Sequence, residues 1–230
     1  MKKVFSYNAN IEKNAYMNWR TNKYEEIHNM NVVAEGFIEG ASILIQECLE
    51  DNCDTKADIL IFPILFSINH SIEVYAKSIC WSLNVLLGNN SKFNKNHDIR
   101  GIWLTAKQKI KDFGFGVGRE EDDFKNMIIT TDKYIDEIFN VIKNEDINNA
   151  YHNIDFSRYP INNRWENHFY IKSFDNVTVD LENLYMIVED IKQCLNRLSG
   201  YYCQLVSQKE EISDYFRKNN LKEEDTKSIN

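Results

Sequence analysis

Apolar residues recur every three or four positions through residues 57–88, the longest such pattern in the chain. They are Ile61, Leu65, Ile68, Ile72, Tyr75, Ile79, Leu83 and Leu86. This spacing places them along one face of a long helix. The alternation at every second position that a strand needs is missing from the stretch. We therefore expect the rest of the chain to pack around this helix.

Other segments carry the same helical spacing. They predict helices over residues 30–50, 98–113, 124–145 and 178–206. Asp98 is placed to cap the second of these. The glycine-containing segment 113–123 predicts a loop, and the stretch around 165–172 predicts a short extended hairpin arm. The expected fold is an all-α, up-and-down helical bundle.

Polarity divides the chain into three parts. Residues 1–29 form a polar, aromatic N-terminal extension, in which we expect a short helix docked on the main body. Residues 30–206 form the helical domain. Residues 207–230 are highly charged and are expected to be a frayed tail. The leucine-rich pattern of 178–206 is typical of a helix that packs against a partner.

Composition narrows the function classes. The chain has 230 residues and a net charge of −8. That sign argues against a protein that coats duplex nucleic acid, although six Lys and Arg residues between 92 and 111 leave room for a local basic patch. The five cysteines form no CxxC pair and residues 1–19 contain no apolar leader. We expect a soluble cytoplasmic protein with no membrane partner, no metal and no other cofactor.

A polar stripe on the long helix is the best candidate for chemistry. His70, Glu73 and Lys77 stand at i, i+3 and i+7, so their side chains lie above one another along the axis. A histidine beside a carboxylate and an ammonium group is typical of general acid–base catalysis. The same stripe is also what a solvated face or a hydrogen-bonded buried cluster looks like.

Several short motifs, taken in order, resemble a known family. They are FSINHSIEVYAK in the long helix, then HDIRGIW from His97, then FSRYP from Phe156, then the leucine-rich helix. This order is similar to the HEPN-like helical proteins of prokaryotes, over about residues 30–200. In such relatives the long helix often reads Arg-His-x-x-Glu-Leu-x-x-Lys, and this chain has Asn69 where the arginine stands.

The resemblance implies a bundle that is commonly dimeric and belongs to toxin–antitoxin or antiphage abortive-infection systems. Many members are metal-independent ribonucleases with an arginine and a histidine separated by four to six residues. The pairs Arg20–His28 and Arg164–His168 do not have that spacing. The open alternative is a non-catalytic interaction, dimerisation or nucleotide-sensing module. The implied partners are RNA or a nucleotide, a second copy bound through the C-terminal helix, and an antitoxin or second defence protein.

The candidate site joins this stripe to the later motifs. We expect a shared polar cleft lined by the following residues. The catalytic candidates are His70, Glu73, Lys77 and His97, and the substrate-binding candidates are Asn69, Arg100, Arg158 and Tyr159. A histidine would take the proton of an RNA 2′-hydroxyl, and a cation would stabilise the charge on phosphorus. His97 could instead cap a helix, and Arg158 and Tyr159 could pin a loop to the bundle.

Overall fold

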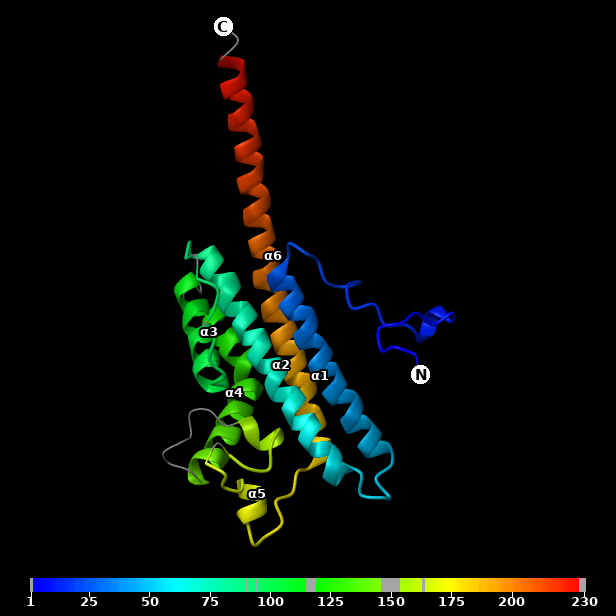
Figure 1. Ribbon diagram of the computed structural model, residues 1–230. Helices are drawn as coiled ribbons and strands as arrows, with labels where there is room; N and C mark the ends of the chain where they lie inside the picture. The colour runs from blue at the N-terminus through cyan, green and yellow to red at the C-terminus, as the bar shows by residue number, and fades with distance from the viewer. Residues whose placement is uncertain are drawn as a thin grey trace.

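The computed structural model describes residues 2–89, 91–93, 95–114, 119–145, 154–162 and 164–227. Over these residues the protein is an all-α helical bundle without a β-strand, which confirms the predicted fold class. The helices are α1 (Glu26–Glu50), α2 (Ala57–Leu86), α3 (Ile99–Gly114), α4 (Arg119–Glu145), α5 (Phe169–Lys172) and α6 (Leu181–Lys227), with 3-10 turns η1 (Ile11–Lys13) and η2 (Ile154–Ser157). Figure 1 shows α6 continuing well beyond the other helices.

Helix α2 is the centre of the bundle. It packs against α1, α3, α6 and η2, and its predicted apolar face includes the fully buried Ile68, Ile72 and Leu83. By length and composition alone, Ala57–Leu86 could cross a membrane. Because the core helix of a soluble protein passes the same test, this finding is weak. The predicted absence of a membrane partner stays a prediction.

Polar side chains of α2 tie it to its neighbours on every side. Ser71 donates to the carbonyl of Ala34 on α1, and Ser78 donates to Asn31 one turn earlier on α1. Tyr75 donates to Asn196 on α6, and Asn69 accepts from Tyr134 on α4. These contacts show that α1 runs antiparallel to α2. Lys209 of α6 reaches the carbonyl of Val85, which together with the Tyr75 contact makes α6 parallel to α2.

The segment 87–98 determines where α3 begins. Its described residues, 87–89, 91–93 and 95–98, run back along α2, where Asn84 Nδ2 donates to the carbonyl of Lys92 at 2.8 Å. His97 therefore lies beside Glu73, and Cys80 lies near the carbonyl of Ile102. Helix α3 consequently runs parallel to α2. The predicted up-and-down alternation therefore holds for the pairs α1–α2 and α3–α4, which are antiparallel, but not for the pair α2–α3.

Three local predictions need correction. The first concerns the loop between η2 and α5. Its turn lies at 160–168, with one bridge between Ile161 and Asn167, and residues 169–172 form α5. The hairpin arm at 165–172 was therefore wrong, because Asn162 Oδ1 accepts the backbone N–H groups of Arg164 and Glu166 and closes the chain earlier.

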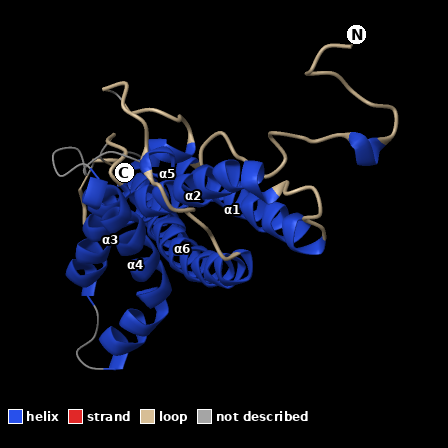
Figure 2. Cartoon of the chain, turned by 90° about the horizontal axis from the view of Figure 1, so that it is seen from below, coloured by secondary structure: helices blue, strands red, loops and turns tan. Residues whose placement is uncertain are grey.

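The two ends also differ from expectation. Residues 207–227 continue α6 as a helix instead of fraying. The N-terminal extension contains the 3-10 turn η1 but no docked helix, and it projects from the bundle (Figures 1 and 2). The loop predicted at 113–123 was too long, because residues 113–114 belong to α3 and residues 119–123 to α4; residues 115–118 lie outside the described residues.

Candidate functional site

Glu73 is the centre of a charged cluster on α2. Its Oε1 accepts from Lys77 Nζ at 2.7 Å, which is the i,i+4 contact expected from the spacing. The same oxygen accepts from His97 Nδ1 at 2.9 Å. Glu73 and Lys77 are buried. The structure thus joins the stripe of α2 to the HDIRGIW motif 24 residues later.

His70 completes the cluster from the previous turn of α2. Its Nδ1 lies 3.9 Å from Glu73 Oε2, a distance that gives electrostatic attraction without a good hydrogen bond. Its ring stacks on Phe66 at a centroid distance of 5.6 Å and meets the edge of Phe37 from α1 at 4.5 Å. Two aromatic rings therefore hold the imidazole of His70 in place.

The cluster keeps Glu73 ionised. Burial alone would raise the pKa of this carboxyl group, but contacts with His70, Lys77 and His97 outweigh burial and lower the pKa to about 2. An ionised carboxylate can only accept a hydrogen bond. His97 must therefore carry its proton on Nδ1, where it meets Glu73, and a neutral His97 has its free lone pair on Nε2.

His97 itself is accessible. Its side chain is 71 % exposed, in contrast to the buried carboxylate that orients it. The next residue, Asp98, caps α3 as predicted, because its Oδ1 accepts the N–H of Gly101 at 3.0 Å. A carboxylate that fixes an imidazole while its second nitrogen faces solvent is the arrangement that a general base requires.

The four substrate-binding candidates lie in different surroundings. Asn69 is buried, and its Oδ1 accepts from Tyr134 at 3.0 Å, so it faces α4 in the core. Arg100 follows His97 in the first turn of α3, where its Nε contacts Asp136 at 3.2 Å and its guanidinium group lies 4.1 Å from the ring centre of Phe139. His97, just before α3, and Arg100, in its first turn, thus lie at the same end of that helix.

Arg158 and Tyr159 belong to the loop after η2. The guanidinium group of Arg158 lies 5.6 Å from the ring centre of Phe66, the ring that also stacks on His70. Arg158 pairs with Asp155 at 3.6 Å, and the side chain of Tyr159 is exposed. The loop therefore reaches the His70 end of the cluster through Phe66.

A cavity of about 480 Å³ opens beside the cluster, between α2, α3 and the segment that returns along α2. Lys77, Asn84, Phe93 and Lys109 are among the residues that line it, and Lys77 is the one member of the four-residue cluster that does so. Lys77 Nζ also lies 5.6 Å from the ring centre of Phe93. The shared cleft expected from the sequence stays a prediction.

Three aromatic residues near the cluster were missed in the sequence. Phe66 precedes His70 by four positions, so the helical spacing could have placed their rings together. Phe37 belongs to the periodic stripe of the helix predicted over 30–50, but that stripe does not say which residues of another helix it meets. Phe93 lies in a polar segment and carries no periodic signal. Among the described residues, no group of three His, Cys, Asp or Glu side chains is arranged to hold a metal ion.

Comparisons with family models, with curated proteins and with solved structures found no match for this chain. The resemblance to HEPN-like proteins is neither supported nor refuted by them.

Proposed function

We propose that the protein is a metal-independent endoribonuclease of the HEPN-like type, acting in an antiphage or toxin–antitoxin system. One observation carries the chemical part of this proposal: the exposed His97 whose Nδ1 is held by the buried, ionised Glu73. The biological setting rests on the resemblance of the motifs alone.

In the proposed reaction His97 Nε2 removes the proton from a 2′-hydroxyl group of RNA. The 2′-oxygen forms a bond to the adjacent phosphorus, the bond from phosphorus to the 5′-oxygen breaks, and that oxygen takes a proton from water. The products are a 2′,3′-cyclic phosphate and a 5′-hydroxyl end. Glu73 is a positioning residue here, because it stabilises the imidazolium that forms on His97.

The negative charge that develops on the phosphoryl oxygens needs a cation. Lys77 is buried and its Nζ already pairs with Glu73, so it balances the carboxylate. Arg100 also has a partner, Asp136, but both side chains are exposed, and Arg100 lies in the first turn of α3, shortly after His97. We assign the phosphate to Arg100, with Tyr159 and Arg158 as contacts for the flanking nucleotide.

The experiment is cleavage of a labelled single-stranded RNA in excess EDTA. The wild-type chain is expected to cleave it, and His97→Ala is expected to lose activity by at least about a hundredfold, the usual contribution of a general base. His28→Ala is the matched control, because His28 is exposed and contacts the carbonyl of Arg20 instead of Glu73. Equal activity of both variants would remove the assignment of His97.

The projecting part of α6 favours a second role, as a dimerisation module. Ile212, Tyr215 and Phe216 share one side of this helix and are exposed. Most helical stability in proteins comes from the packing of an apolar face, so a partner that covers this side would stabilise the projecting part. We propose that a second copy covers this side. Double substitution of Ile212 and Phe216 by Glu should then weaken the dimer in sedimentation experiments.

The free state of all five cysteines fits a reducing compartment, and we propose a cytoplasmic location on that basis. An antitoxin or second defence protein stays a proposed partner, supported by the resemblance alone.

A further inference from the structure

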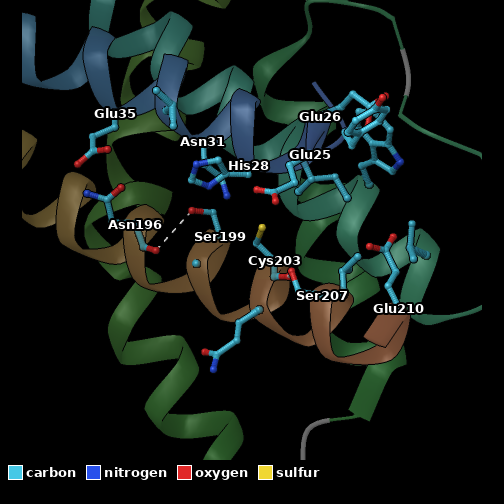
Figure 3. Close-up of a pocket in the computed structure, with 18 residues that line it drawn as sticks. Glu25, Glu26, His28, Asn31, Glu35, Asn196, Ser199, Cys203, Ser207 and Glu210 are labelled. Atoms are coloured by element: carbon cyan, nitrogen blue, oxygen red, sulfur yellow. Dashed lines mark hydrogen bonds between the residues drawn. The ribbon is translucent and has the colours of Figure 1, made fainter. Parts of the chain in front are cut away.

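A groove lies between α1, α2 and α6 at the point where α6 leaves the bundle. It has a volume of about 380 Å³ and apolar walls that include Val32, Trp81 and Val85. Figure 3 shows α1 and α6 supplying its polar rim, with His28 and Cys203 facing each other across it. It lies at a different place in the fold from the Glu73 cluster.

The rim of this groove is acidic. Glu25, Glu26, Glu35 and Glu210 line it, and no Lys or Arg does so among the residues that the structure describes. Two of the carboxylates act on the half-buried Cys203: burial raises the pKa of this thiol, and Glu25 and Glu210 raise it further. The groove thus combines apolar walls with a negatively charged rim, and both are complementary to a basic segment with aromatic side chains.

The N-terminal extension is such a segment. Residues 2–23 carry five basic residues against one acid, in a chain whose net charge is −8. Its large apolar side chains are exposed, for example Phe5 at 85 % and Trp19 at 81 %. Exposed apolar side chains that gather together mark an interaction site.

The base of the extension is fixed so that it points away from its own groove. The N–H of Asn22 donates to Asn29 Oδ1 at 2.7 Å, and Asn29 Nδ2 donates to the carbonyl of Asn22 at 2.6 Å. The carbonyl of Arg20 contacts His28 Nε2 at 3.1 Å. These bonds hold residues 20–22 against the first turn of α1, and Figure 1 shows the extension leaving the bundle from there.

We propose that the N-terminal extension of one copy docks into the acidic groove of a second copy, so that two chains exchange their extensions. The basic residues of the extension face the four glutamates, and its aromatic side chains cover the apolar walls. Because the groove lies at the base of the projecting part of α6, this contact is compatible with the dimer proposed above and adds an independent interface to it.

Charge reversal tests the exchange in the full-length chain. Variant A carries Lys2→Glu, Lys3→Glu and Lys13→Glu, and variant B carries Glu25→Lys and Glu210→Lys. Each alone should dimerise at least about tenfold more weakly than the wild type in sedimentation velocity, because like charges then face each other. All five positions are exposed, so circular dichroism should show both variants folded.

An equimolar mixture of A and B should recover the dimer, because the mixed pair has opposite charges at both contacts. Docking of each extension into its own groove would leave variants A and B dimerising as strongly as the wild type, and would overturn the proposal. A dimer that is as strong in variant A, and after removal of residues 1–19, as in the wild type would also overturn it. If that dimer is lost with the double substitution of Ile212 and Phe216, the α6 interface stands while the exchange fails.

Discussion

Replacing Glu73 by Gln should destabilise the fold more than any change on the protein surface. The substitution keeps the size of the side chain but removes the charge that balances Lys77. Lys77 is buried, with 9 % of its side chain exposed, and its Nζ lies 2.7 Å from Glu73 Oε1. A buried ammonium group without a counterion is costly.

The structure gives the size of the effect in two ways. A fall in the pKa of Glu73 from 4.5 to about 2 corresponds to about 3 kcal/mol of stability at neutral pH. Removal of one partner from a buried ion pair costs about 3–5 kcal/mol in other proteins. We therefore expect Glu73→Gln to lower the free energy of unfolding by about 3 kcal/mol, which is about 6–12 °C in Tm for a chain of this size.

Urea unfolding followed by circular dichroism measures this loss. The double variant Glu73→Gln with Lys77→Met should recover a large part of it, because an apolar pair no longer leaves a buried charge. Lys125→Met is a matched control, since Lys125 pairs with Glu121 on the exposed surface at the same spacing. A loss below about 1 kcal/mol in Glu73→Gln would show that the Glu73–Lys77 pair is solvated, and would refute this reasoning.

Three further predictions follow from the same geometry. The pKa of Glu73 is lower in the folded chain than the usual 4.5, so the stability that its carboxylate contributes is fully present above about pH 4.5 and is lost as the pH falls toward 2. The difference in free energy of unfolding between wild type and Glu73→Gln, measured with urea at each pH, should therefore shrink over that range. A constant difference would contradict this prediction. Gly101→Ala should destabilise the start of α3 by about 1 kcal/mol in urea unfolding, because a Cβ at this position would lie 2.4 Å from Asp98 Oδ2; Gly200→Ala, where a Cβ meets nothing within 4 Å, is its control. Arg100→Gln should slow RNA cleavage by at least about tenfold, whereas Lys107→Gln should not. Equal effects of the two substitutions would show that Arg100 does not contact the phosphate.

Much of the fold could be predicted because its signals are local. The period of three and four residues marks the buried face of α2, and the i,i+4 spacing places Lys77 on Glu73. The capping role of Asp98 is also local, since the carboxylate meets an N–H three residues later. These features depend on neighbours in the chain and need no knowledge of how the helices pack.

The features that could not be predicted depend on packing. The return of 87–98 along α2 is fixed by hydrogen bonds from the buried amide of Asn84 to backbone atoms of Ser91 and Lys92, and no periodic pattern marks it. That return is what brings His97 to Glu73. The sequence likewise placed Asn69 among the substrate contacts, although the side chain faces Tyr134 in the core.

The most direct test of the central claim is the chemistry of the RNA ends produced in EDTA. A substrate with one reactive ribonucleotide among deoxyribonucleotides should give a 2′,3′-cyclic phosphate and a 5′-hydroxyl end with the wild-type chain, and no product above background with His97→Ala. Ends that carry a 3′-hydroxyl group, or cleavage that continues when the single 2′-hydroxyl is removed, would contradict a general base at His97.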